Sequence, residues 1–183
     1  QVTMFRYHST LEATHSFASS WYEWPLDIRP IWYFAGDTQE GYSTISAFGN
    51  PLLWWAGIPA LGAAACLWWK ERFRWAVLAG FLSVYLPWVL VPRLTFIYHY
   101  FTAVPFLVVA LCGVFSQLYQ RGGFARQLTF PGGIQCSGAT LLLAAFTAAC
   151  LLLFAVYFPV LSGSPTTRDY ANALELFETW YFA

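Results

Sequence analysis

The chain has 183 residues, of which 58% are hydrophobic, 21% aromatic and only 10% charged, and its formal net charge is zero. This composition excludes an ordinary soluble domain and indicates an integral membrane protein. Membrane lipids are therefore expected partners, and nucleic acid is not.

The first informative segment, residues 21–34, reads WYEWPLDIRPIWYF and is dense in aromatic side chains. It precedes the first long apolar run, yet it carries Glu23, Asp27 and Arg29. Trp and Tyr rings place an apolar body in lipid and a polar tip in water, so this segment is expected at the membrane surface. Residues 1–49 would then form an external, interfacial aromatic region.

Long apolar stretches without Asp, Glu, Lys or Arg follow at 41–69, 75–92, 94–120 and 127–167. They are continuous rather than alternating, and lipid offers no partner to an open strand edge, which favours helices over a barrel. Roughly 20 apolar residues are needed to cross the hydrocarbon core. The sequence therefore predicts an all-α, polytopic bundle with four transmembrane helices near 51–69, 75–91, 95–118 and 139–161.

Local signals add detail to this four-helix module, residues 50–161. Pro51 suits the first turn of the first helix, and Trp54 and Trp55 are expected to belong to the interfacial aromatic belt. Pro105 is predicted to kink the third helix by freeing a backbone carbonyl. In the external tail, residues 162–183, the apolar spacing predicts a short interfacial helix over 174–180.

Basic residues indicate the orientation. Lys70, Arg72 and Arg74 lie between the first two predicted helices, and Arg121 and Arg126 lie between the last two. Loops rich in Lys and Arg remain in the cytoplasm. The aromatic N-terminal segment and the C-terminal tail are therefore expected on the external face.

Arg93 is the only formal charge between the second and third predicted helices. A helical reading places Tyr100 on its face, and places Thr95, His99 and Thr102 on a separate polar stripe. His99 would lie about 9 Å deeper than Arg93, and a titratable group at that depth is a functional candidate. The alternative is a neutral histidine bonded to Thr95 or to a neighbouring helix.

The aromatic segment supplies further candidates. The Arg29 guanidinium is suited to a phosphate or carboxylate, although contact with lipid headgroups is an equal alternative. Trp21 and Trp24 could stack on a sugar or pack along a prenyl chain, but belt residues look the same. Glu23 and Asp27 are expected to bond Arg29, backbone amides or water rather than to act as a catalytic pair.

Metal binding is not predicted, because the histidines are scattered at His8, His15 and His99 and no CxxC pair occurs. No cofactor is expected. The chain also opens at Gln1 without a start Met or a targeting segment, so we expect that it continues a longer protein.

Several blocks occur in the order seen in one family. His8 and His15 precede SSWYEWPLDIRPIWYF, GNPLLWW follows at 49–55, and PRLTFIYHYFTAVPF follows at 92–106. Together they resemble the C-terminal four-helix membrane module of protein O-mannosyltransferases, and the WPLxxRPIWY form looks like the bacterial members. The likeness covers nearly the whole chain and departs from the family pattern at Ser16 and Thr102.

This resemblance implies a glycosyltransferase of the GT-C class in the bacterial plasma membrane. Such an enzyme transfers mannose, with inversion, from polyprenyl-phosphate mannose to Ser or Thr of an exported protein. The family's catalytic acidic pair lies in the N-terminal half, to which nothing here corresponds. Catalytic residues are thus unknown in this chain, which is expected to be inactive without that half and to bind carrier and acceptor. The binding candidates are Arg93, His99, Tyr100, Arg29, Trp21 and Trp24.

Two rival functions stay open at this point. A related lipid-linked sugar transferase with a non-protein acceptor would share the arginines and aromatic residues. A non-catalytic membrane scaffold subunit would share the helices and lack the catalytic half altogether.

Overall fold

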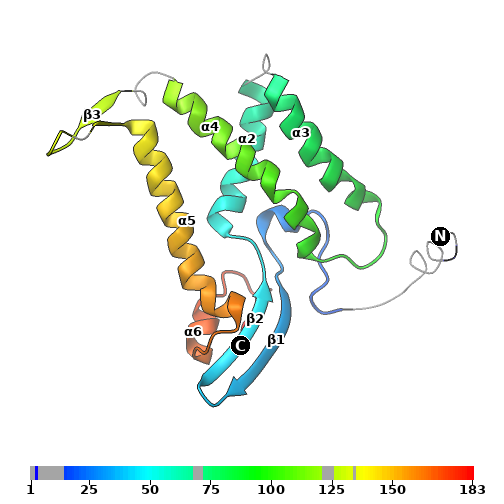
Figure 1. Ribbon diagram of the computed structural model, residues 1–183. Coiled ribbons are helices and arrows are strands. Elements are labelled where there is room, and N and C mark those ends of the chain that lie inside the picture. Colours follow the sequence, from blue (N-terminus) through cyan, green and yellow to red (C-terminus); the bar gives the residue numbers. More distant parts are fainter. Residues whose placement is uncertain (1–2, 4–14, 68–71, 121–125, 134) are drawn as a thin grey trace.

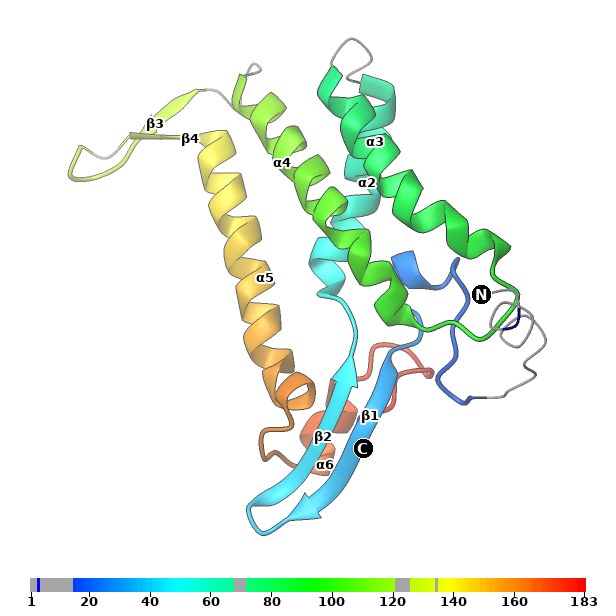
Figure 2. The ribbon, with the colours of Figure 1, turned by 45° about the vertical axis from the view of Figure 1, so that its right-hand side comes forward.

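The structure is a computed structural model and describes residues 3, 15–67, 72–120, 126–133 and 135–183 (Figure 1). His8, Lys70 and Arg121 lie outside these residues. Within them the elements run from an N-terminal hairpin through a helical bundle and back to a C-terminal tail beside the hairpin (Figures 1 and 2).

Each predicted apolar span contains a helix. The helices are α2 (Pro51–Leu67), α3 (Arg72–Tyr85) with the 3₁₀ helix η2 (Leu86–Leu90), α4 (Val104–Gln120) and α5 (Gly138–Ser162). Two of these helical stretches, Arg72–Leu90 and Gly138–Ser162, are long and apolar enough to cross a membrane. The α2 and α4 helices are apolar but have 17 residues each, so the predicted number of four spans stays a prediction.

Helix starts follow the local sequence closely. The α2 helix begins at Pro51 as predicted, and the side-chain oxygen of Asn50 accepts a hydrogen bond from the Leu53 amide at 3.3 Å. Ser137 precedes α5, and its hydroxyl accepts from the Thr140 amide at 3.1 Å. Both side chains satisfy amide groups that have no partner within the first helical turn.

The prediction of an all-α fold is wrong outside the bundle. Strand β1 (Ile31–Thr38) pairs antiparallel with β2 (Gly41–Ala47), and a second, short hairpin joins β3 (Gln127–Thr129) to β4 (Gln135–Ser137). The first turn uses Gly41 at a φ of 137°, which favours glycine. Because 41–47 lacks charges, composition merged it with the first apolar window, although Tyr42, Thr44 and Ile45 are typical strand residues.

The third helix begins later than predicted. Residues 97–102 form a 3₁₀ helix, η3 (Ile97–Thr102), and α4 starts at Val104. Pro105 therefore lies in the first turn of α4, where a missing amide costs little, and it does not kink the helix. Since Arg93 precedes η3, the predicted shared helical face of Arg93 and Tyr100 is also wrong.

The tail differs from its prediction as well. Its helix is α6 (Arg168–Ala173), capped by the Thr167 hydroxyl, which accepts from the Tyr170 amide at 3.1 Å. Residues 174–180 form turns instead of the expected helix. In this tail, the N-cap residue Thr167 predicts where the helix starts, whereas the apolar spacing of 174–180 does not.

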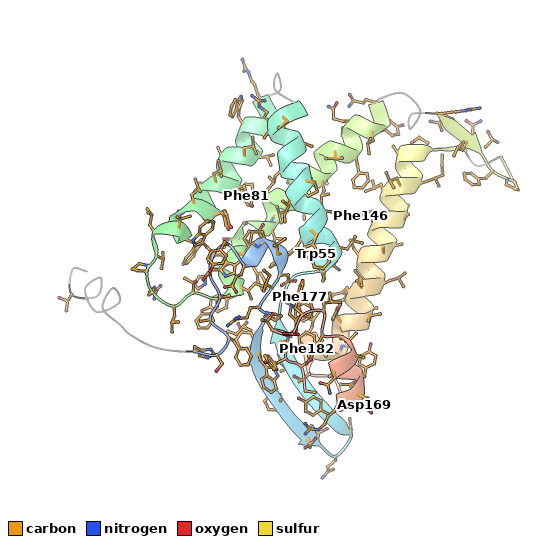
Figure 3. All side chains as sticks on the ribbon, turned by 180° about the vertical axis from the view of Figure 1, so that it is seen from behind. Trp55, Phe81, Phe146, Asp169, Phe177 and Phe182 are labelled. Carbon is orange, nitrogen blue, oxygen red and sulfur yellow. The ribbon has the colours of Figure 1, made fainter. Side chains whose placement is uncertain are left out.

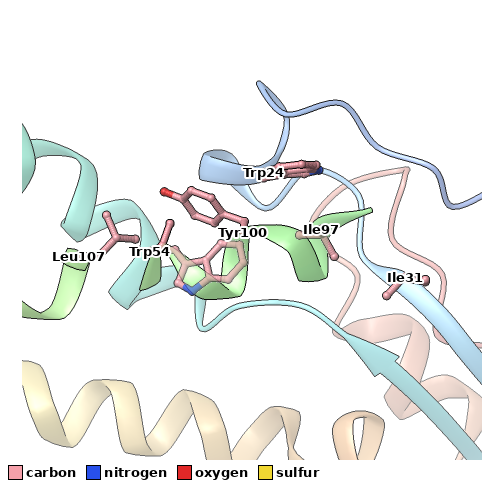
Figure 4. Packing of buried hydrophobic residues seen from close by; sticks show 7 residues of the cluster. Trp24, Ile31, Trp54, Ile97, Tyr100 and Leu107 are labelled. Carbon is pink, nitrogen blue, oxygen red and sulfur yellow. The ribbon is translucent and has the colours of Figure 1, made fainter. Parts of the chain in front are cut away.

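The main core lies where the bundle meets the aromatic segment. Its buried members are Trp24, Ile31, Trp54, Ile97, Tyr100, Ala103 and Leu107 (Figure 4). Trp54 is only 2% exposed, so it is not the belt residue expected, whereas Trp55 is 38% exposed. The Trp55 ring faces Phe177 of the tail at 6.3 Å between centroids (Figure 3).

A second core joins the hairpin, the end of α5 and the tail, around Tyr42, Phe48, Tyr157, Val160, Ala171, Trp180 and Phe182. The Tyr42 hydroxyl donates to the Phe182 carbonyl at 2.9 Å. Between these contacts and β4, much of α5 is uncovered, with Leu151 and Leu152 more than 60% exposed. This surface is suited to lipid or to further protein.

Candidate functional site

His99 is held in a cage of aromatic rings. Its imidazole stacks on Trp24 at 5.8 Å between centroids and contacts Trp88 at 4.1 Å and Tyr98 at 4.4 Å. Its Nδ1 lies 2.8 Å from the carbonyl oxygen of Phe96 and 3.1 Å from the amide nitrogen of the same residue. The imidazole is thus fixed through one nitrogen and its faces, while no described residue hydrogen-bonds Nε2.

Thr95, one of the two alternative partners considered for His99, does not bond its imidazole. The Thr95 hydroxyl donates to the Ser19 carbonyl at 2.7 Å, and the Thr102 hydroxyl donates to the backbone carbonyl of His99 at 3.0 Å. Both hydroxyls therefore satisfy backbone groups. The polar stripe does not exist as a unit, because η3 has three residues per turn instead of 3.6.

Arg93 is exposed in the connection between η2 and η3 and makes no ion pair with a described residue. Burial lowers the pKa of His99, the hydrogen bond to Phe96 opposes this, and the positive charge of Arg93 lowers it further. His99 is consequently neutral at pH 7. Arg93 is thus an exposed cation whose charge acts on the neutral imidazole of His99.

Two other candidates are core residues. Trp24 is fully buried, and its indole N–H donates to the Ser19 hydroxyl at 3.0 Å. Tyr100 is 1% exposed and packs edge-on against Trp54 at 5.0 Å (Figure 4). Trp24 still contacts the site through its stack on His99, whereas the side chain of Tyr100, itself in η3, packs into the main core.

Trp21 is half-buried at the border of the same cluster. Its ring meets Tyr85 edge-on at 6.0 Å, and its carbonyl accepts a hydrogen bond from the Tyr85 hydroxyl at 2.8 Å. The contact ties the aromatic segment to α3. It leaves Trp21 partly accessible at the surface of the molecule.

Arg29 lies apart from this cage, in a pocket of about 400 Å³ lined by Ser16, Phe17, Arg29, Trp32, Thr179 and Tyr181. Its Nε is 4.0 Å from the Glu23 carboxylate, and Glu23 also accepts from the Ser20 amide at 2.5 Å. The expected structural role of Glu23 is therefore confirmed. The two arginines, Arg29 and Arg93, do not line one pocket.

Asp27 was expected to bond Arg29, backbone amides or water, and the structure gives it a different environment. It is fully buried with a left-handed φ of 57°, and among the described residues neither carboxylate oxygen has a hydrogen-bond partner. Burial raises the pKa of Asp27 well above its usual value, and the nearby Gly49 amide offsets only part of this effect. The backbone is used instead, since the Trp180 indole N–H donates to the Asp27 carbonyl at 2.8 Å.

Several site residues were missed by the sequence reasoning. Trp88 and Tyr98 complete the cage around His99, and Thr179 and Tyr181 close the Arg29 pocket. Trp88 lies in a predicted span and Tyr181 directly follows the predicted tail helix, so both look like ordinary interfacial aromatics. Only the tertiary contact between tail and aromatic segment reveals the pocket.

Comparison with known proteins gives consistent matches. The family model described as the C-terminal four TMM region of protein-O-mannosyltransferase matches residues 1–78 and 68–180. A Mycobacterium tuberculosis polyprenol-phosphate-mannose–protein mannosyltransferase is 28% identical over 96% of this chain. A dolichyl-phosphate-mannose–protein mannosyltransferase 1 of Saccharomyces cerevisiae is 23% identical over 97% of it.

Structural comparison agrees on the fold. The S. cerevisiae protein O-mannosyltransferase Pmt1-Pmt2 complex bound to the sugar donor superposes with a TM-score of 0.76 at 21% identity, over 99% of this chain and 26% of that chain. The chain spans 35% of the length of the M. tuberculosis relative and 22% of the yeast relative. This chain therefore belongs to the family of C-terminal four-transmembrane regions of protein O-mannosyltransferases.

Proposed function

We propose that this chain is the carrier-binding part of a membrane glycosyltransferase that moves mannose from polyprenyl-phosphate mannose to Ser or Thr of an exported protein. The M. tuberculosis relative is named for a polyprenol-phosphate-mannose donor and a protein acceptor, and this supports the choice of substrates. The remaining part of the longer protein would be its main partner.

The caged His99, whose pKa the charge of the exposed Arg93 lowers, is the observation that carries this proposal. A guanidinium is suited to a phosphate through parallel hydrogen bonds. The free Nε2 edge of a neutral imidazole can donate to, or accept from, a phosphate or a sugar hydroxyl, depending on its tautomer. Exposed aromatic and apolar side chains nearby, among them Tyr98 at 39% and Leu90 at 83%, offer an apolar surface for a prenyl chain.

The membrane placement follows the charges. Arg72 begins α3 and Arg93 follows its far end, so the two basic sites lie at opposite ends of a helical stretch of 19 residues. With Arg72 at the cytoplasmic surface, Arg93 is external. Residues 1–49 and 162–183 then form one external layer on the 50–161 module, in a bacterial plasma membrane.

Removal of the acceptor proton needs a carboxylate, and the aromatic segment does not supply a suitable one. Glu23 is held by Arg29 and the Ser20 amide, and Asp27 is fully buried, where desolvation raises its pKa well above the usual value and disfavours the carboxylate form that a base needs. We therefore place the catalytic carboxylate in the rest of the longer protein. Arg93 and His99 are assigned to binding the leaving phosphate.

The test is transfer of radiolabelled mannose from polyprenyl-phosphate mannose to a Ser/Thr peptide in membranes. These membranes contain the longer protein of which this chain is proposed to be a part, called the full-length parent below. Arg93→Ala should lower kcat/KM by about tenfold or more, since a hydrogen bond to a charged group contributes roughly 1.5–3 kcal/mol. Arg72→Ala, an exposed arginine at the other end of α3, is the matched control. The chain without its parent should give no transfer.

Two results would reject the proposal. A parent that labels lipid but never peptide would be a sugar transferase with a non-protein acceptor. A parent that transfers mannose equally well with Arg93→Ala and with Arg72→Ala would place the carrier phosphate elsewhere.

A further inference from the structure

The β1–β2 hairpin is open on one side only. Tyr42 of β2 exchanges two backbone hydrogen bonds with Thr166 of the tail, at 3.0 and 2.8 Å. The outer edge of β1 has no such partner among the described residues. Alternate residues of an edge strand direct their N–H and C=O groups outward, where an extended polypeptide can pair with them.

The edge of β1 carries little of the protection usual for such strands. Lysines, prolines and unpaired charges normally discourage pairing. The single charge in β1, Asp37, is neutralised by Arg168 at 2.8 Å. A bulge lies at Tyr33, but register is regular from Phe34 to Thr38, and Tyr33 and Phe34 are 57% and 49% exposed.

This edge leads to the Arg29 pocket. Only Pro30 lies between Arg29 and the start of β1, and Trp32 of β1 lines the pocket. Phe17 meets the rings of Trp32 and Tyr181 edge-on at 5.8 and 6.3 Å, which gives the pocket aromatic walls. From Arg29 to Thr38 an extended chain covers about 30 Å, the length of a peptide of about ten residues.

The charge of the pocket specifies its occupant. Arg29 Nε is buried without a hydrogen bond, and its nearest carboxylate, Glu23, is at 4.0 Å and already bound to Ser20. The Thr179 hydroxyl is also engaged, by the Ile28 carbonyl. A carboxylate that enters the pocket would find a guanidinium with unused donors between aromatic walls.

We propose that an extended segment of the acceptor polypeptide pairs with the free edge of β1 and places an acidic side chain in the Arg29 pocket. This inference rests on the proposed function, because it supplies that transferase with a protein-binding site. Backbone pairing would hold the segment, and the acidic residue would fix its register relative to the reacting Ser or Thr.

The first experiment measures binding of fluorescent peptides of about ten residues to the full-length parent in nanodiscs, without donor. One Glu is moved through the peptide, and each Glu peptide is compared with its Gln counterpart. At one position the Glu peptide should bind about tenfold more tightly than the Gln peptide. Arg29→Ala should abolish this ratio, and Arg72→Ala should preserve it.

The second experiment leaves the protein unchanged and methylates the peptide backbone nitrogens one at a time. Pairing with β1 predicts that alternate positions lose affinity, because only every second N–H points at the edge. Uniform effects along the peptide would overturn the strand-pairing part of the inference.

The outcomes separate this inference from the proposed function. Equal binding of Glu and Gln peptides at every position, with mannose transfer intact, would overturn the inference alone. If Arg29→Ala instead lowers affinity for polyprenyl-phosphate mannose, Arg29 belongs to the carrier phosphate and the inference is wrong. If the parent binds the Glu peptide selectively but transfers no mannose, the proposed mannosyltransferase function is rejected. The peptide site at the β1 edge and the Arg29 pocket would still be supported.

Discussion

Arg168 and Asp37 form a two-pronged ion pair across 131 residues of sequence, with one guanidinium nitrogen 2.9 and 2.8 Å from the two carboxylate oxygens. The same guanidinium lies 4.4 Å from the centre of the Tyr42 ring. These contacts attach α6 to the hairpin. Both charged side chains are more than half exposed, so solvent weakens their attraction.

Arg168→Ala should therefore lower the free energy of unfolding by less than about 1 kcal/mol while loosening the tail locally. Hydrogen exchange should speed up at the amides of α6 and β2 and remain unchanged in α2 and α4. Asp37→Ala should have the same pattern, and double substitution should add little. Faster exchange throughout the bundle would contradict a local role.

Asp27 should make stability depend on pH. Its pKa is raised by burial, so the folded protein holds a proton that the unfolded chain releases. Stability is then highest below the unfolded pKa of about 3.9 and falls as pH rises toward the folded value. Thermal unfolding of the parent in nanodiscs between about pH 4 and 8 should show this slope, and Asp27→Asn should reduce it.

The matched variant for that experiment is Asp27→Ala. Asparagine tolerates the left-handed backbone, whereas alanine carries a penalty of roughly 1–2 kcal/mol. Asp27→Ala should thus remove the same pH dependence but be less stable than Asp27→Asn at every pH. Equal stability of the two variants would mean that the φ of 57° imposes no strain.

Trp54 and Trp55 are adjacent but should respond very differently to truncation. Trp54 is 2% exposed in the main core, so Trp54→Ala should cost about 3–5 kcal/mol. Trp55 is 38% exposed and donates to the Leu26 carbonyl at 3.0 Å, so Trp55→Ala should cost about 1 kcal/mol. Denaturant unfolding of both variants checks the contrast, and similar losses would contradict it.

Gly163 ends α5 at a φ of 73°, where a Cβ would lie 2.9 Å from Cγ1 of Ile45. Gly163→Ala should therefore cost more than 1 kcal/mol, through both backbone strain and displacement of β2. Gly62→Ala is the control, because nothing lies within 4 Å of its Cβ position in α2. Gly62→Ala should be neutral or stabilising in the same thermal assay.

The sequence predicts the bundle well because apolar windows and helix caps act locally. Pro51 marks the start of α2, and each apolar window contains a helix. The hairpin escapes prediction, since Tyr42 and Ser43 look like part of an apolar run until their partners in the tail are known. Composition cannot show that residues 31–47 and 162–183 form one layer.

The candidate site is predicted in part for a related reason. Arg93 and His99 stand out by charge and position, and the charge of Arg93 acts on the pKa of His99. Tyr100 and Trp24 have suitable chemistry but are used in packing, which depends on Ile97 and Leu107 beside them. Asp27 could not be foreseen, because its burial follows from a left-handed turn and from Trp180, 153 residues later.

Tyr42 and Ser43 bond Phe182 and Gly163, residues that follow them by 140 and 120 positions. During synthesis the hairpin must therefore leave the ribosome long before the groups that complete it. The layer of hairpin and tail can close only after α5 and the tail have been made, so until then the open hairpin is available to chaperones and to incorrect strand partners.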